Sequence, residues 1–391
     1  MDWNFLIKDK DALCVTTDSR KVIPGCIFVA LKGEHFDGNA FVDQAKADGA
    51  AYIISGDNAL AELQDLARAW RRELGLPILA ITGTNGKTTT KELCAAVLST
   101  KKHIYYTQGN LNNQLGVPLT LLSITRAHEM AIVEMGASHP GDIKELVEIA
   151  EPNFGLITNV GRAHLQGFGS FEGVMRTKAE LYDWLRAHGG FCFRNTDNPY
   201  LAEMAGDLKT IGYKTGTMPN GTHLVGEYNA ENVSAAICVG NYFDVSKEDA
   251  LAAIRAYVPS NNRSQLMQTE RNTVVVDAYN ANPTSMTAAI EAFCRQPSNG
   301  SLQQCFILGG MRELGEYSHL EHQNIVNMLL ERKADMVLLI GDEYRDTTAP
   351  YPIFSDVEAL CEHLKAHPIS GAHILLKGSR GNQLEKAIPF L

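Results

Sequence analysis

Residues 83–90, Gly-Thr-Asn-Gly-Lys-Thr-Thr-Thr, have the composition of a loop that grips phosphate. The glycines let the backbone turn tightly, so that its amide groups can face phosphate oxygens, and a following helix would add its positive N-terminal end. Lys87 supplies a mobile cation, and the Thr88 hydroxyl suits Mg²⁺. Only two residues separate the two glycines, whereas the common phosphate loop has four. An ordinary strand-to-helix turn is the alternative, but the combination of residues favours an ATP-using enzyme.

Two possible metal ligands follow the apolar runs downstream of this loop. Glu134 ends the run that begins at Ala131, where a parallel sheet presents its site, and its carboxylate suits Mg²⁺. The alternative for Glu134 is an exposed carboxylate at the end of a strand. His164 follows the apolar run at 155–159. A lone histidine in a loop is more often structural or solvated, so the sequence leaves its role open.

Lys178 lies on the apolar face of a predicted helix at 171–185. Apolar residues recur on that face at helical spacing, and position 178 is three or four residues from its apolar neighbours. An inward lysine is costly unless it is paired or chemically altered. A lysine that extends its ammonium group into water is an equally good interpretation of the pattern.

Polar residues also follow two apolar runs near the C-terminus. Asp277 closes the run at 273–276 and precedes Ala-Tyr-Asn-Ala-Asn-Pro at 278–283. The run at 373–376 leads into Lys-Gly-Ser-Arg at 377–380, whose charges and flexible glycine suit a carboxylate or a phosphate. A solvated loop is the alternative in each case, but two such loops in one domain favour a site.

These residues need elements to position them, and the chain predicts an α/β protein. Strand-like runs alternate with helix-like stretches almost throughout, which favours mainly parallel sheets. We expect three domains, at 1–77, 78–258 and 259–391, with the polar stretch 259–262 as a linker. The central domain holds the glycine loop, and the C-terminal domain should be Rossmann-like. The predicted strands are 26–31, 51–55, 78–82, 131–135, 155–159, 273–277, 305–308, 336–340 and 373–376. The predicted helices are 58–74, one from about 87, 171–185, 285–295 and 321–332.

Composition excludes several classes of protein. The 391 residues carry a formal charge of −10, which argues against a general nucleic-acid binder. The eight cysteines include no Cys-x-x-Cys pair, so we expect reduced, buried thiols in place of a zinc site or disulfides. The N-terminus lacks the pattern of a signal peptide, and no apolar run approaches the roughly 20 residues of a membrane helix. We therefore expect a cytoplasmic protein without membrane insertion.

Taken together, the motifs resemble those of the Mur ligase family. The glycine loop has the family's shortened spacing, and further matches follow in the family's order at 109–118, 134–136, 158–164, 178–180 and 229–232. The stretches 17–20, 28–34, 277–283, 308–315 and 377–380 resemble the members that add D-alanyl-D-alanine to UDP-N-acetylmuramoyl-tripeptide. The resemblance covers nearly the whole chain. Tyr228, Ala278 and Gly310 depart from the usual residues of those members.

The resemblance implies an enzyme that uses ATP and Mg²⁺ and acts on UDP-N-acetylmuramoyl-tripeptide and D-Ala-D-Ala, and we expect a monomer. A P-loop ATPase-like central domain would bind ATP through Gly83, Thr84, Asn85, Gly86, Lys87, Thr88, Thr89, Asn229, Arg263 and Asp277. Magnesium ligands and catalytic groups would come from Thr88, Lys87, Glu134, His164 and a Lys178 carbamylated by CO₂. The substrates would be bound by Ser19, Arg20, Asn112, Asn113, Asn280, Ser379 and Arg380. A related ligase with another amino acceptor, a folylpolyglutamate synthase and a non-catalytic P-loop nucleotide binder are the alternatives.

Overall fold

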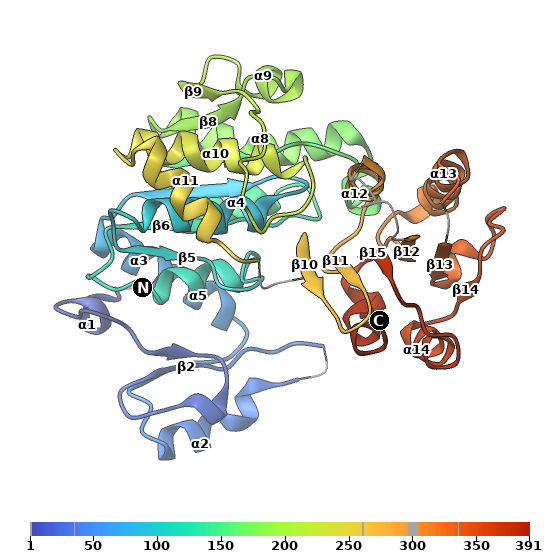
Figure 1. Ribbon diagram of the computed structural model, residues 1–391. Coiled ribbons are helices and arrows are strands. Elements are labelled where there is room, and N and C mark those ends of the chain that lie inside the picture. The colour runs from blue at the N-terminus through green and yellow to red at the C-terminus, as the bar shows by residue number, and fades with distance from the viewer. Residues whose placement is uncertain (1, 35, 260–261, 296–302, 335) are drawn as a thin grey trace.

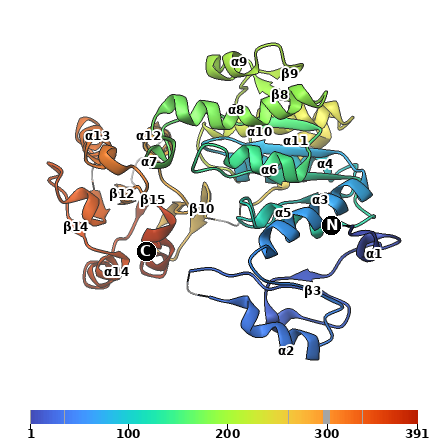
Figure 2. The ribbon, with the colours of Figure 1, turned by 180° about the vertical axis from the view of Figure 1, so that it is seen from behind.

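The computed structural model describes residues 2–34, 36–259, 262–295, 303–334 and 336–391. It has three parallel or mainly parallel sheets, each with helices packed on it. Figures 1 and 2 show an N-terminal domain below the central domain, in the orientation of Figure 1, and a C-terminal domain beside it. The predicted α/β class with three domains is therefore confirmed. The predicted linker at 259–262 includes residues 260 and 261, which lie outside the described residues.

The N-terminal domain is built on a small parallel sheet of three strands in the order β1-β2-β3. Its elements are α1 (Asn4–Ile7), β1 (Val15–Thr16), β2 (Ile27–Val29), α2 (Val42–Ala47) and β3 (Tyr52–Ile54). The expectation that all cysteines are reduced thiols is wrong here, because Cys14 and Cys26 form a disulfide. Val15 pairs with Ile27 in the sheet, and this register brings the two preceding residues side by side.

The central domain has a six-stranded sheet in the order β5-β6-β4-β7-β8-β9, and every pairing in it is parallel. Its strands are β4 (Ile78–Thr82), β5 (Ile104–Tyr106), β6 (Met130–Glu134), β7 (Phe154–Ile157), β8 (Phe191–Asn195) and β9 (Thr210–Tyr213). All five residues of β4 and of β6 are buried, as expected for strands covered on both faces. The carboxyl ends of β4 and β6 are adjacent, since Ile81 pairs with Glu134.

Helices cover both faces of this sheet because successive strand residues point to opposite sides. On one face, Ile78 and Ala80 pack with α3 (Ala59–Leu74), α5 (Gly116–Leu122), α6 (Asp142–Ala150) and α8 (Phe171–Ala187). On the other face, Leu79 and Ile81 pack with α4 (Lys87–Leu98), α10 (Asn229–Tyr242) and α11 (Lys247–Ala256). Two shorter helices, α7 (Leu165–Phe168) and α9 (Pro199–Ala205), complete the domain.

The C-terminal domain has a second six-stranded sheet, in the order β10-β11-β15-β12-β13-β14. Only the edge strand β10 is antiparallel to its neighbour, and the other four pairings are parallel, as predicted for a Rossmann-like domain. The strands are β10 (Gln265–Gln268), β11 (Thr273–Asp277), β12 (Gln303–Gly309), β13 (Met336–Ile340), β14 (Ile353–Phe354) and β15 (Ala372–Lys377). The helices are α12 (Pro283–Arg295), α13 (Ser318–Glu331) and α14 (Val357–Ala366). None of the helices in the described part of the chain is long and apolar enough to cross a membrane.

Candidate active site

The glycine loop joins β4 to α4, and its two glycines have no room for a side chain. Gly83 has a φ of 143°, and a Cβ there would lie 1.9 Å from the hydroxyl oxygen of Thr158. Gly86 has a φ of 78°, and a Cβ there would lie 2.4 Å from Oδ1 of Asn232. Both backbone conformations are rare for other residues. The short glycine spacing therefore produces a tight turn that fits against β7 and α10.

Replacing Gly83 with alanine should destabilise the protein and abolish nucleotide binding. The strained backbone costs about 1–3 kcal/mol, and the methyl group must also displace Thr158. Gly56→Ala is a matched control, because Gly56 also has a positive φ, of 88°, but a Cβ there meets no atom within 4 Å. Thermal unfolding and ADP titration should show a larger loss of stability for Gly83→Ala and loss of binding for that variant alone. An equal loss of stability and equal ADP binding in the two variants would mean that backbone strain alone, and not the contact with Thr158, explains the effect of the substitution.

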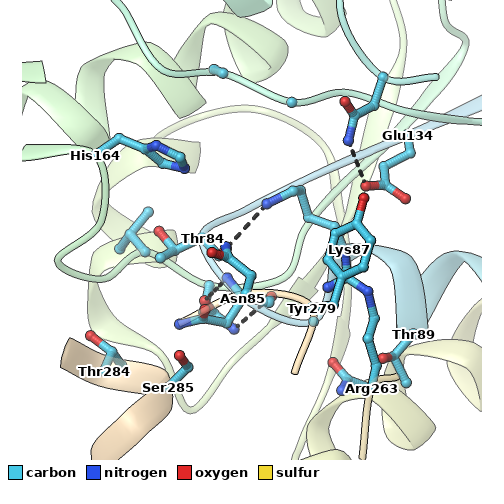
Figure 3. Close-up of a pocket in the computed structure, with 18 of the residues that line it drawn as sticks. Thr84, Asn85, Lys87, Thr89, Glu134, His164, Arg263, Tyr279, Thr284 and Ser285 are labelled. Atoms are coloured by element: carbon cyan, nitrogen blue, oxygen red, sulfur yellow. Dashed lines mark hydrogen bonds between the residues drawn. The ribbon is translucent and has the colours of Figure 1, made fainter. Parts of the chain in front are cut away.

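Lys87 opens α4 and folds back over the loop. Its Nζ donates hydrogen bonds to the carbonyl oxygens of Gly83, at 2.7 Å, and Thr84, at 3.1 Å. Burial lowers the pKa of Lys87 to about 8, against an opposing effect of Glu134. Figure 3 shows Lys87, Glu134 and His164 around the same cavity. The ammonium group thus lies where an anionic phosphate would replace the weaker carbonyl partners.

Glu134 is 1% exposed and lies beside the start of α4. Its Oε1 accepts hydrogen bonds from the Thr88 hydroxyl, at 3.2 Å, and from Nδ2 of Asn112, at 2.9 Å. Its Oε2 has no hydrogen-bond partner, although Nζ of Lys91 is 3.5 Å away. No group of three or more histidine, cysteine, aspartate or glutamate side chains forms a closed metal site in the described residues. Magnesium is commonly held by one or two carboxylates together with waters and phosphates, so this donor set fits it.

Lys178 is buried, with 2% of its surface exposed, so the inward position is confirmed and the extended, solvated one is wrong. Burial and the nearby charge of Lys87 lower the pKa of Lys178 well below its usual value, against Asp142 and Glu180, which raise it. The only ring near its Nζ in the described residues is that of Phe168, whose centroid is 5.6 Å away. Burial of this kind disfavours the charged form of an amine.

His164 precedes α7 in a left-handed backbone conformation, with a φ of 50°. Its Nδ1 contacts the carboxylate of Glu313, which belongs to the C-terminal domain. Burial lowers the pKa of His164, and Glu313 opposes this effect. His164 thus lies at the junction of two domains. Sequence analysis had left its role open.

Further contacts hold the C-terminal domain against the glycine loop. Nδ2 of Asn282 donates to Oδ1 of Asn85 at 2.8 Å, and Nη1 of Arg162 lies 3.4 Å from the carboxylate of Glu321. Between the two domains is a cavity of about 630 Å³. The predicted residues that line it are Thr84, Asn85, Gly86, Lys87, Thr89, Asn112, Asn113, Glu134, His164, Asn229, Arg263, Asp277 and Asn280. We call it the main cavity.

At the end of the main cavity that is lined by the C-terminal domain, Arg263 stacks on Tyr279, with 3.9 Å between the guanidinium carbon and the ring centroid. Asp277 accepts a hydrogen bond of 2.6 Å from Nζ of Lys377, which is 1% exposed in its side chain. Tyr228, one of the departures from the family pattern, places its hydroxyl 2.7 Å from that of Ser264. Asn229, Arg263 and Asp277, which were predicted to bind the nucleotide, all line the main cavity.

The predicted acceptor residues Asn280, Ser379 and Arg380 line a second, smaller cavity of about 180 Å³, which we call the side cavity. Ser19 and Arg20 line none of the cavities described here, and Arg20 pairs instead with Asp18 at 2.8 Å. The contact of Ser19 and Arg20 with the UDP substrate therefore stays a prediction.

Several residues of the site were given no individual role by sequence analysis, although Asn282 and Lys377 lie in polar runs that it singled out. They are Lys91, Asn159, Asn282, Arg312, Glu313 and Lys377. Asn282 and Lys377 stood inside polar runs at strand ends, which was a usable signal. Arg312 and Glu313 follow the apolar run that forms β12, and the same rule could have found them.

Three family models match the chain. They are described as "Mur ligase family, catalytic domain" over residues 13–96, "Mur ligase middle domain" over residues 81–221, and "Mur ligase, glutamate ligase domain" over residues 262–380. Together they span most of the described chain, including the glycine loop and most of the residues that line the two cavities.

Curated relatives and solved structures agree with these matches. The UDP-N-acetylmuramoyl-tripeptide--D-alanyl-D-alanine ligase of Bacillus subtilis is 33% identical over 96% of this chain and 92% of its own. The ligase of the same name from Escherichia coli is also 33% identical, over 96% and 93%. The MurF ligase of Thermotoga maritima, solved in complex with ADP, is 26% identical and superimposes with a TM-score of 0.86 over 98% of each chain. The chain belongs to the Mur ligase family.

Proposed function

We propose that the protein is an ATP-dependent ligase that joins D-Ala-D-Ala to UDP-N-acetylmuramoyl-tripeptide in peptidoglycan precursor synthesis. The observation that carries this is the main cavity, in which the phosphate loop, Glu134 and His164 of one domain face Asp277 and Asn280 of another. Relatives that share nearly the whole length of the chain have this activity in their names. The segments 1–77, 78–258 and 259–391 would bind the UDP substrate, ATP and the acceptor respectively.

The reaction couples amide formation to ATP cleavage. An oxygen of the tripeptide's terminal carboxylate attacks the γ-phosphorus, the bond to the β-phosphate oxygen breaks, and ADP leaves. The product is an acyl phosphate, whose phosphate is a much better leaving group than a carboxylate oxygen. The ammonium group of D-Ala-D-Ala first loses one proton, and the resulting neutral amine attacks the acyl carbon. The nitrogen of the tetrahedral intermediate then loses a second proton, and phosphate leaves as the amide forms.

The chain's own residues stabilise charge and orient the reactants in this scheme. Lys87 would exchange its carbonyl partners for the transferring phosphoryl group and offset its charge. Thr88 and Glu134 would hold Mg²⁺, which offsets phosphate charge when bound. His164 and a carbamylated Lys178 would hold a second Mg²⁺, as the resemblance to the family implies. Because one wall of the cavity belongs to the C-terminal domain, movement of that domain would control entry and completion of the site.

Phosphate release tests the proposal directly. With ATP, Mg²⁺ and UDP-N-acetylmuramoyl-tripeptide present, we expect rapid phosphate release only when D-Ala-D-Ala is added. The mass of the product should exceed that of the UDP substrate by the mass of the dipeptide minus one water. Release with an amino acid and UDP-N-acetylmuramoyl-dipeptide would identify a related ligase, and release with glutamate and a folate would identify a folylpolyglutamate synthase. Nucleotide binding without release under any of these conditions would instead identify a non-catalytic nucleotide binder.

A further inference from the structure

The side cavity meets the main cavity at His164 and Asn280, which line both. Two arginines, Arg312 and Arg380, line it, and Arg380 is paired with Glu385. The carboxylate of Glu313 also lines it and contacts His164. Ser379 lines the same cavity, is 4% exposed, and its hydroxyl has no hydrogen-bond partner in the described residues. Two cations and a buried, unsatisfied donor are the groups that bind a carboxylate.

Arg312 is held at this wall by Glu343. Its Nη1 lies 3.2 Å from Oε1 of Glu343, whose side chain is 18% exposed, whereas that of Arg312 is 58% exposed. A guanidinium group has five N–H donors, so this single ion pair leaves most of them available to a ligand in the side cavity.

Two glycines make room for the Glu343 carboxylate. A Cβ at Gly310 would lie 2.6 Å from Oε2 of Glu343, and one at Gly341 would lie 2.3 Å from the same atom. Any side chain at these positions would therefore push the carboxylate away from Arg312. The packing here serves to keep the ion pair in place.

We propose that Arg312 binds the carboxylate of the amino acceptor in the side cavity, and that Glu343 is a positioning residue for its guanidinium group. This rests on the proposed function and names a specificity residue for it. With its carboxylate against Arg312 and Ser379, a short dipeptide directs its amine toward His164, where the two cavities meet. Acceptors without a free carboxylate are therefore poor substrates.

The test compares Arg312→Gln with Arg345→Gln. Arg345 is a matched control, since its side chain is 59% exposed, it pairs with Asp342 at 2.8 Å, and it lines neither cavity. A hydrogen bond to a charged group contributes enough that Arg312→Gln should raise KM for D-Ala-D-Ala roughly 10- to 100-fold. The KM values for ATP and for the UDP substrate should not change, nor should the thermal midpoint. Arg345→Gln should behave as wild type.

The amide D-alanyl-D-alaninamide separates carboxylate binding from a structural effect. The wild-type enzyme should use it about as poorly as Arg312→Gln uses D-Ala-D-Ala, and the variant should show no further loss with it. Arg312→Lys should recover part of the affinity, and Glu343→Gln should raise KM for D-Ala-D-Ala by a smaller factor at unchanged kcat. An unchanged KM in Arg312→Gln, or an equal additional loss with the amide, would overturn the proposal.

A partial reaction distinguishes this proposal from the proposed function. Acyl phosphate formed without acceptor can be trapped with hydroxylamine as a hydroxamate, and Arg312→Gln should form it at the wild-type rate. Loss of trapping in that variant would show that Arg312 acts before the acceptor binds, and the inference fails. If the wild-type enzyme shows no acceptor-dependent phosphate release at all, the proposed function is what fails.

Discussion

Replacing Lys87 with methionine is expected to lower the rate of acyl-phosphate formation by roughly 10²- to 10³-fold, the usual effect of removing one preorganised donor to developing charge. Methionine keeps most of the side chain's length and apolar contacts but removes the ammonium group. Within the described residues, the hydrogen bonds of that group go to two carbonyl oxygens of its own loop, at 2.7 and 3.1 Å. Its charge is therefore available to phosphate when ATP binds.

Rapid-quench measurement of ADP formation, with the UDP substrate and without acceptor, gives the rate of this step. Lys46→Met is a suitable control, because Lys46 is a surface lysine, 63% exposed in its side chain, on the N-terminal domain. Lys87→Met should remain folded, since it removes the desolvation cost that lowers the pKa of Lys87 to about 8. An acyl-phosphate rate within threefold of wild type would show that Lys87 does not act on the transferring phosphoryl group.

The central strands and the place of Lys178 on the apolar face of its helix could be predicted from the sequence because their signals are local. Whether the lysine is buried or reaches water was left open. The strands β4, β11 and β13 begin and end where the apolar runs do. Lys178 also has a local signal, because apolar residues at helical spacing on both sides of it define the buried face of α8. Edge strands such as β10 and β14 were missed, because they are short or alternate in exposure and give no continuous apolar run.

Contacts between distant parts of the chain could not be predicted in this way. Asn85 and Asn282 are 197 residues apart, and His164 and Glu313 are 149 apart. Their meeting depends on how two domains pack, and no spacing rule encodes this. The Cys14–Cys26 disulfide was not predicted for a related reason: the two cysteines are twelve positions apart in the sequence, and only the register of β1 and β2 brings them together.

The Lys178→Ala variant is expected to lose ligation by roughly 10²-fold or more and to regain part of it with acetate or formate. We propose that the buried amine carries a carbamate, formed when the neutral amine attacks CO₂ and loses a proton. Burial and Lys87 lower the pKa of Lys178, so the neutral, nucleophilic form is available. Carbamylation places an anion at this buried position, which suits a metal ion beside His164.

A short carboxylic acid fits the space left by the lysine and returns the missing anion. Rescue would therefore show that the negative charge at this position matters, and not the shape of the lysine side chain. The control is Arg176→Ala, which changes an exposed residue of the same helix and should keep full activity without response to acetate. Peptide mass analysis of wild type under CO₂ should show the added carboxyl group on Lys178, and Mn²⁺ titration followed by electron paramagnetic resonance should show one weakened site in Lys178→Ala. Full activity of Lys178→Ala without added acid would refute the carbamate. Loss of activity with no rescue, no mass change and unaltered Mn²⁺ binding would leave Lys178 with a purely structural role in α8.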